Sequence, residues 1–159
     1  MMKITVICLG KLKEKYLSAA CDEYRKRLSR YCSLDFVELD PVKLPDKPSK
    51  SEIDLALDKE ADLILKKIPQ NSEVYTLCIE GKQLSSEALA EKVSTLKNMG
   101  KSLTFVIGSS YGLSPKIKSL SQLKLSFSQM TFPHQLFRVM LLEQIYRAFK
   151  IDEGSEYHK

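Results

Sequence analysis

Hydrophobic residues along the chain alternate between short continuous runs and longer stretches with helical spacing. Runs with few polar interruptions are typical of strands buried on both faces of a sheet, whereas apolar positions three and four residues apart indicate amphipathic helices. The pattern predicts strands at residues 2–9, 34–39, 74–79, 103–107 and 123–127, and helices at residues 11–31, 51–68, 85–98, 114–120 and 133–149.

The regular alternation of strands and helices indicates the fold class. Such βα units build parallel sheets, because the connecting helices return the chain to the same edge. We therefore expect an α/β fold with a mainly parallel sheet and helices on both faces. No internal repeat or change of composition divides the chain, so residues 1–159 are predicted to form a single domain, with residues 150–159 as a polar tail.

Turn-forming residues set the predicted ends of several elements. Residues 41–50 contain three prolines and are predicted to form a mobile loop. Ser51 and Asp54 resemble a capping box at the start of the following helix, and Pro69 ends that helix. Gly81–Gln83 is expected to turn the chain from the third strand into the next helix.

Composition and charge narrow the function classes. The chain has 159 residues, of which 43% are hydrophobic and 28% charged, as in an ordinary globular domain. No apolar run approaches the roughly 20 residues that span a bilayer, and residues 1–10 lack a secretory signal, so we expect a cytoplasmic protein without membrane association. The 25 basic and 20 acidic residues give a net charge of +5, which permits a polyanionic partner without requiring one.

Cysteine and histidine usage argues against a metal centre. The four cysteines, Cys8, Cys21, Cys32 and Cys78, include no C-x-x-C pair, and there are only two histidines. A structural zinc site needs about four closely spaced ligands. We therefore predict reduced, mostly buried thiols and no bound metal.

Three loops follow predicted strands in the second half of the chain, at residues 80–82, 108–112 and 126–131. In open α/β sheets, ligands bind beyond the carboxyl ends of the strands. The glycines and small hydroxyl residues of these loops would let the backbone approach a ligand closely, although strand-to-helix turns need the same residues for geometry alone. These loops form the candidate ligand site.

The loop at residues 108–112 matches the G-x-S-x-G pattern of serine hydrolases, with Ser110 as the nucleophile. Asp152 and His158 follow in the order typical of that class. Against this alternative, the chain is short for the hydrolase fold, and both partners lie in the polar tail, where no packing is evident that would hold a triad rigid. The loop lacks the G-x-G-x-x-G and Gly-Lys-Ser/Thr patterns, which argues against dinucleotide and P-loop nucleotide binding.

The last predicted helix is apolar on nearly every side, so it is either a central core helix or a helix buried against a second subunit. His134 and Arg138 share a helical face within it, as do Glu143 and Arg147.

The chain ends in Tyr157, His158 and Lys159. An aromatic ring, an imidazole and a cation can supply the base stacking, proton transfer and phosphate contact that RNA modification needs. A frayed terminus often has the same composition, so the residues alone leave both interpretations open.

Several motifs, in this order along the chain, resemble a known family. They are Met2–Ile4, Gly10–Lys13, Leu77–Lys82 with Ser85 and Ser86, Phe105–Gly108, Ser126–Gln135, Glu143–Ala148 and the Tyr157-His158 ending. Over essentially its whole length the chain is similar to SPOUT-class methyltransferases that act on N3 of a pseudouridine in ribosomal large-subunit (23S) RNA.

The resemblance implies features that the residue pattern alone does not show. They are a carboxyl-terminal trefoil knot, a homodimer with the active site at the subunit interface, a functional tail at residues 150–159, and S-adenosylmethionine as methyl donor without a metal. The positions that match the family's donor contacts are Leu77, Gly108, Ser109, Phe127, Ser128, Gln129, Met130, Thr131, Phe132 and Pro133. Ser109 departs from the family, which commonly has a second glycine there. Its side chain is expected to alter the affinity for the donor without abolishing binding.

The resemblance also suggests roles for polar residues near the end of the chain. His158 is expected to assist loss of the ring-nitrogen proton, and Tyr157 to stack on or position the base. Arg138 is expected to hold a phosphate or a developing oxyanion. Arg147 and Lys159 are expected to bind RNA.

The size of the chain bears on how it would find its RNA. A chain without an appended RNA-binding module is expected to recognise the assembled ribosome, and the basic helix at residues 11–31 is a candidate surface, with a plain solvated helix face as the alternative. A ribosome-binding factor that has lost catalysis is the non-enzymatic alternative. Only the change at Ser109 favours it.

Overall fold

The computed structural model describes residues 1–159 and contains one five-stranded sheet. All paired strands are parallel, and their order across the sheet is β2-β1-β4-β3-β5. The predicted α/β fold is confirmed. Its elements are β1 (Met2–Leu9), α1 (Lys15–Leu28), β2 (Cys32–Leu39), α2 (Lys50–Leu65), β3 (Ser72–Gln83), α3 (Ser86–Asn98), β4 (Ser102–Ile107), α4 (Pro115–Leu120), β5 (Leu123–Ser126) and α5 (His134–Asp152).

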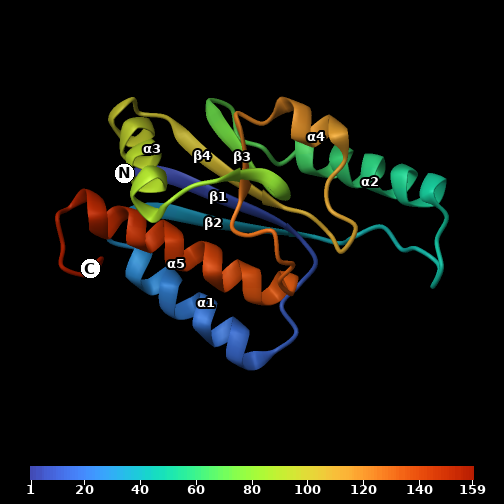
Figure 1. The fold of residues 1–159 in the computed structure, drawn as a ribbon, viewed down its shortest axis with the longest axis horizontal. Helices are drawn as coiled ribbons and strands as arrows, with labels where there is room; N and C mark the ends of the chain where they lie inside the picture. Colours follow the sequence, from blue (N-terminus) through green and yellow to red (C-terminus); the bar gives the residue numbers. More distant parts are fainter.

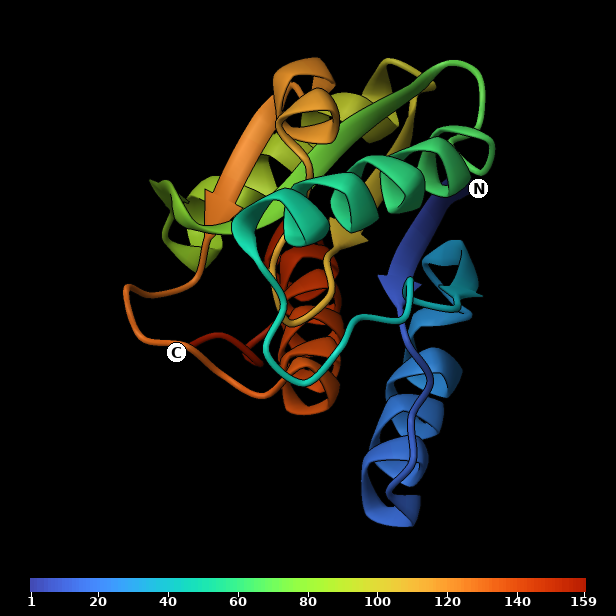
Figure 2. The same cartoon turned by 90° about the vertical axis from the view of Figure 1, so that its right-hand side faces the viewer.

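Helices cover both faces of the sheet, as Figure 1 and Figure 2 show from two directions. α1, α3 and α5 pack on one face, and α2 and α4 cover the other. Side chains of β1 point alternately to the two faces of the sheet. Ile4 and Val6 belong to the larger hydrophobic cluster beneath α1, α3 and α5, whereas Ile7 and Leu9 belong to the smaller cluster beneath α2 and α4. Burial on both faces explains the continuous apolar sequence of this strand.

The first helix begins later than the sequence predicts, at Lys15 instead of residue 11. Gly10 has a φ of +115°, which L side chains rarely adopt, and the chain that follows it is not helical. The amide of Lys13 donates a hydrogen bond to the side chain of Gln135 on α5, at 3.0 Å. This contact with another element replaces the hydrogen bonding of the predicted first turn.

The second helix begins with a capping box formed by Ser49 and Glu52, so the predicted box at Ser51 and Asp54 is wrong by two residues. The Ser49 hydroxyl accepts from the Glu52 amide, and the Glu52 carboxylate accepts from the Ser49 amide, each at 3.2 Å. Both serines fit the simple pattern, but glutamate is the acid that commonly completes the box, because its longer side chain reaches back to the N-cap.

The third strand is longer than predicted and is irregular near its end. β3 continues through Gln83, and its pairing with β5 is interrupted between Leu77 and Lys82. A Cβ atom at Gly81 would lie 2.6 Å from the carbonyl oxygen of Lys124, so only glycine allows the two strands to approach this closely. The predicted turn at Gly81–Gln83 is therefore wrong.

The last helix extends further than predicted, to Asp152, so the first three residues of the predicted tail 150–159 are helical and the tail proper begins at Glu153. The carboxyl-terminal half of α5 is buried against α1 and α3, through Leu141, Leu142, Ile145, Ala148 and Phe149. In the amino-terminal half, Leu136 is exposed and Val139 and Met140 are half-buried. The apolar surface not covered by the core lies in this amino-terminal half.

Candidate functional site

A cavity of about 340 Å³ lies at the carboxyl ends of β3, β4 and β5. This is the edge of a parallel sheet at which ligands bind, and the volume falls within the usual range for small-molecule sites. Eight of the ten residues predicted to contact a donor line it, and Gln129 and Pro133 do not. The eight are Leu77, Gly108, Ser109, Phe127, Ser128, Met130, Thr131 and Phe132.

The interruption of β3 adds residues to this cavity. Cys78, Ile79 and Glu80 lie between the two paired parts of the strand and line the cavity wall. Burial raises the pKa of the Cys78 thiol, so this group is a neutral thiol at physiological pH. A continuous apolar run gives no sign of where its ladder breaks, and Gly81 is the one residue in the segment that could have indicated the irregularity.

The loop after β4 forms a tight wall of the cavity. A Cβ atom at Gly108 would lie 2.4 Å from the carbonyl oxygen of Gly112, and the Gly112 amide donates to the Ser109 carbonyl at 2.9 Å. Glycine is therefore required at position 108 by close approach. Ser109 is not in the left-handed region, so a side chain fits its backbone without strain.

An ion pair between α4 and the interrupted part of β3 lies on the wall of the cavity. The ammonium group of Lys118 is 2.6 Å from the carboxylate of Glu80, and its hydrogen bond lowers the pKa of that carboxyl. The pair offers a ligand one cation and one anion side by side. Sequence reasoning missed Lys118, because a lysine on a short helix is typical of a solvated face.

Arg138 lies outside the cavity, although the sequence interpretation gave it a catalytic role. It is 5% exposed, and its guanidinium donates to the Glu38 carboxylate at 2.8 Å and to the Gly10 carbonyl at 3.1 Å. These contacts fasten α5 to the ends of β1 and β2. The expected contact with a phosphate or an oxyanion does not fit this buried and already paired position.

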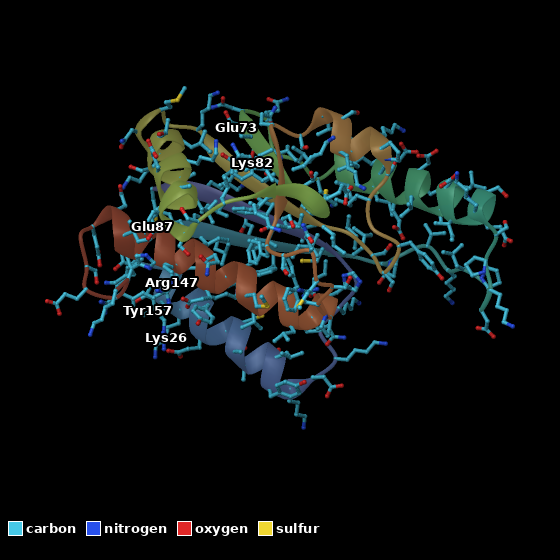
Figure 3. All side chains as sticks on the ribbon, viewed as in Figure 1. Lys26, Glu73, Lys82, Glu87, Arg147 and Tyr157 are labelled. Atoms are coloured by element: carbon cyan, nitrogen blue, oxygen red, sulfur yellow. The ribbon has the colours of Figure 1, made fainter.

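The tail folds back onto the carboxyl-terminal half of α5, where Figure 3 shows Tyr157 close to Arg147. The Tyr157 hydroxyl donates to Glu143 at 2.9 Å, and the Arg147 guanidinium lies over the Tyr157 ring, 4.7 Å from its centre. Burial and the Glu143 carboxylate raise the pKa of Tyr157. These contacts order the tail, which the sequence left open as a frayed terminus.

Both ring nitrogens of His158 have partners in this arrangement. Nδ1 lies 3.2 Å from the Arg147 guanidinium, and Nε2 lies 2.7 Å from the carboxylate of Glu87 on α3. Arginine can only donate, so Nδ1 accepts and Nε2 carries the proton that Glu87 accepts. The imidazole therefore has no free lone pair in the tail position of this structure.

The predicted site residues thus form two separate groups. The residues that lead into α5 line the cavity at one end of this helix. The tail lies at the other end, where Figure 1 shows the C-terminus. His134 lines the cavity and Arg147 contacts the tail, and these two positions lie roughly 20 Å apart along the helix axis at 1.5 Å per residue. Neither Tyr157 nor His158 lines the cavity of its own chain.

The serine hydrolase alternative is not supported by the geometry. Ser110 lines the cavity, but its predicted partners are engaged elsewhere: Asp152 pairs with Lys97, and His158 pairs with Glu87. No hydrogen bond connects Ser110 with either of them, and a triad requires those hydrogen bonds.

Three further predicted features concern the surface, metal binding and the membrane. Lys159 is exposed at the end of the chain. No group of three or more histidine, cysteine, aspartate and glutamate side chains is arranged to hold a metal ion. None of the helices has the length and hydropathy that crossing a membrane requires.

Comparison with known proteins gives matches over the whole chain. Residues 2–158 match the family described as "Predicted SPOUT methyltransferase". The ribosomal RNA large subunit methyltransferase H of Clostridium novyi (strain NT) is 54% identical over 159 residues, covering 99% of this chain and 100% of that protein. The protein of the same name from Clostridioides difficile (strain 630) is 51% identical over the same shares. A protein of Methanococcus maripaludis (strain C5), which carries that name provisionally, is 55% identical over the same shares.

Proposed function

Because this chain belongs to the SPOUT methyltransferase family, we propose that it transfers a methyl group from S-adenosylmethionine to N3 of a pseudouridine in ribosomal large-subunit RNA. The family and the names of the full-length relatives make it an S-adenosylmethionine-dependent rRNA methyltransferase. The observation that supports S-adenosylmethionine as the donor is the cavity at the carboxyl ends of three adjacent strands, lined by eight of the predicted donor contacts. The choice of N3 of a pseudouridine as the acceptor rests on the family. Family membership also implies a trefoil knot in the carboxyl-terminal half.

The residues of the cavity fit this donor. Leu77, Ile107 and Phe127 supply an apolar surface for the flat adenine ring. The paired charges of Lys118 and Glu80 match the carboxylate and ammonium groups at the methionine end of the donor. The bound donor supplies an electrophilic methyl group on a sulfonium sulfur, and the task of the cavity is to hold that group facing the acceptor nitrogen.

The transfer requires a proton acceptor. As the bond between N3 and the methyl carbon forms, the sulfur–carbon bond breaks with its electron pair going to sulfur, and N3 loses its proton. We assign His158 to assist this loss, with Tyr157 positioning the base. Nδ1 of His158 accepts from Arg147 in the folded tail, at 3.2 Å, so it becomes available only when Arg147 turns away. Binding of an RNA phosphate would draw the Arg147 guanidinium away from His158 and so free Nδ1.

The separation of the tail from the cavity supports a homodimer. One subunit would then supply the donor cavity, and the tail of the other subunit would supply Tyr157 and His158. The apolar residues of the amino-terminal half of α5 that the core leaves uncovered, among them Leu136 and Met140, suit such a contact. An isologous dimer would have two equivalent active sites.

The assembled ribosome is the proposed substrate, which would place the protein in the cytoplasm. Basic residues on and beside α1, including Lys11, Lys13, Lys26 and Arg30, are exposed and are a candidate docking surface. If this surface binds RNA, activity will fall steeply with salt concentration, because each phosphate contact releases counterions.

The test is transfer of labelled methyl groups from S-adenosylmethionine to ribosomes that lack the modification, with naked RNA as a comparison. Incorporation at a pseudouridine N3 of the large-subunit RNA in ribosomes, with loss in His158→Ala, is the expected result. Incorporation that survives in His158→Ala would keep the function and remove His158 as the proton acceptor. Donor binding without transfer would instead indicate a ribosome-binding factor.

A further inference from the structure

A second cavity adjoins the donor cavity. It measures about 380 Å³ and is lined by α2, by the proline-containing segment between β2 and α2, and by the loop after β4. Four residues line both cavities, namely Ser109, Ser110, Tyr111 and His134. The two spaces therefore lie side by side around the loop after β4 and the start of α5.

The second cavity contains a buried carboxylate with one oxygen unused. Glu60 of α2 is 4% exposed, and its Oε2 accepts a hydrogen bond from the Val42 amide at 2.9 Å. The other oxygen has no hydrogen-bond partner in the protein, and no lysine, arginine or histidine forms an ion pair with Glu60. This free oxygen is not enclosed by protein atoms, because the only enclosed side-chain polar atom without a partner is Nε of Arg138. Since Glu60 lines the second cavity, the oxygen has access to that cavity.

A carboxylate oxygen that the protein leaves free and that faces a cavity can accept a hydrogen bond from a bound molecule, so this position favours a ligand that supplies a hydrogen-bond donor. The remaining walls narrow the class of ligand. They contain a second carboxylate, Asp46, and no lysine or arginine, which disfavours a phosphate. The Tyr111 ring and the hydroxyls of Ser109 and Ser110 suit a flat, neutral ring with polar edges. A nucleobase with an exposed N–H has this chemistry.

We propose that the second cavity receives the target base, and that Glu60 accepts a hydrogen bond from N1–H of pseudouridine and so selects it over uridine. Pseudouridine is joined to its ribose through carbon, so both N1 and N3 carry hydrogen. With N3 facing the donor cavity, N1–H lies on the other side of the C2 carbonyl and is free to meet the carboxylate. Uridine in the same pose would present a C–H group there and leave Glu60 unpaired. This specificity role rests on the proposed function.

Sites built to hydrogen-bond a substrate group discriminate strongly against analogues that lack it. The test compares methyl transfer to ribosomes with pseudouridine at the target position and to ribosomes with unmodified uridine there. The variant is Glu60→Gln, whose amide oxygen can still accept from the Val42 amide while its NH₂ group replaces the free oxygen. Asp62→Asn is the matched control, because Asp62 lies on the same helix outside the cavity and pairs with Lys116 on the surface.

The wild type and Asp62→Asn are expected to prefer pseudouridine. In Glu60→Gln, the ratio of the pseudouridine rate to the uridine rate is expected to fall at least about tenfold, with donor affinity and thermal midpoint unchanged. An unchanged ratio in a folded Glu60→Gln protein would overturn the inference. If the wild type transfers no methyl group to pseudouridine-containing ribosomes, the proposed function itself fails, which is a separate outcome.

A second measurement avoids any risk that the variant does not fold. Wild-type protein is given large-subunit particles reconstituted with N1-methylpseudouridine at the target position, which removes the N1–H donor without changing the protein. A rate at least about tenfold below that with pseudouridine is expected. An equal rate would overturn the assignment of Glu60 as the group that recognises N1–H.

Discussion

Arg138 on α5 and Glu38 on β2 form an ion pair in which the two partners are unequally buried. Their charged groups lie 2.8 Å apart, and the side chain of Arg138 is 6% exposed while that of Glu38 is 37% exposed. The buried positive charge of Arg138 is therefore balanced by Glu38 and not by water, whereas the carboxylate of Glu38 retains access to water.

This inequality predicts an asymmetric effect of removing each partner. Glu38→Ala leaves a buried cation unpaired and is expected to lower the free energy of unfolding by about 3–5 kcal/mol. Arg138→Met leaves a carboxylate that water can reach, and a smaller loss of about 1–2 kcal/mol is expected. Urea unfolding of the two variants measures both values. A larger loss in Arg138→Met would contradict the description of this pair.

Gly108→Ala is expected to disrupt donor binding. The new Cβ atom would lie 2.4 Å from the Gly112 carbonyl oxygen, so the loop must shift into the cavity or away from it. Isothermal calorimetry with S-adenosylmethionine is expected to show at least a tenfold weaker affinity, together with a loss of about 1–3 kcal/mol in stability.

The neighbouring position serves as the comparison. Ser109→Gly is expected to retain binding, because glycine can adopt the ordinary backbone conformation that Ser109 has, and the substitution adds no atom to the cavity wall. Wild-type affinity in Gly108→Ala would mean that this loop does not form the wall of the donor site.

Stability is expected to fall on acidification through His134. Loss of solvent around its ring, at the wall of the two cavities, lowers the pKa of its imidazole in the folded chain. Below about pH 6.5, the ordinary pKa of histidine, the unfolded chain takes up a proton that the folded imidazole resists, so the free energy of unfolding decreases as the pH falls. Between about pH 7 and pH 5, the free energy of unfolding measured with urea is expected to decrease less in His134→Gln than in the wild type. His158→Gln is the control. Identical slopes in the wild type and His134→Gln would count against this contribution.

Donor binding is expected to protect Cys78 from alkylation. Burial raises the pKa of all four cysteine thiols, but only Cys78 lines the cavity, whereas Cys8, Cys21 and Cys32 belong to the hydrophobic core and are out of reach of the reagent. Mass spectrometry after treatment with iodoacetamide measures modification of each cysteine with and without S-adenosylmethionine. Protection confined to Cys78 supports the assignment of the cavity, and equal modification under both conditions speaks against it.

A shared active site predicts complementation between inactive subunits. Gly108→Ala would impair the donor cavity, and His158→Ala would impair the tail. When the two variants are mixed and reassembled, half of the dimers would be mixed and each mixed dimer would have one intact site, so about a quarter of wild-type activity is expected. Activity no higher than that of the separate variants would show that each chain acts on its own.

The fold and the donor site could be predicted from the sequence to different depths. β1 and β4 were identified because each is a nearly continuous apolar run, and burial on both faces of the sheet explains that pattern. The edge strands β2 and β5 include charged residues and are only partly buried. The predicted start of α1 was wrong because the contact of Lys13 with Gln135 joins residues far apart in the sequence, and periodicity does not show such contacts. The irregularity of β3 was missed for a related reason, since its cause is the close approach of Gly81 to Lys124.

Among the site residues, those on loops after strands were predictable and those on helices were not. Gly108 directly follows β4, where ligands bind at the carboxyl ends of parallel strands, whereas Leu77 lies within β3 and was named from the family resemblance. Lys118 and Glu60 lie on helices, and only the packing of those helices shows that they face cavities. Arg138 has the residue type of a phosphate ligand, but its burial beside Glu38 gives it a structural role.

The order of strands in the sheet also has a consequence for synthesis of the chain. Met2 pairs with Cys32, so β1, α1 and β2 can associate early, but the other edge of β1 pairs with β4, where Ile4 lies beside Leu103. At about 5–20 residues per second, translation takes seconds to supply that partner. The growing chain therefore passes through a stage in which the strand made first has an unpaired apolar edge, and aggregation competes with folding at that stage.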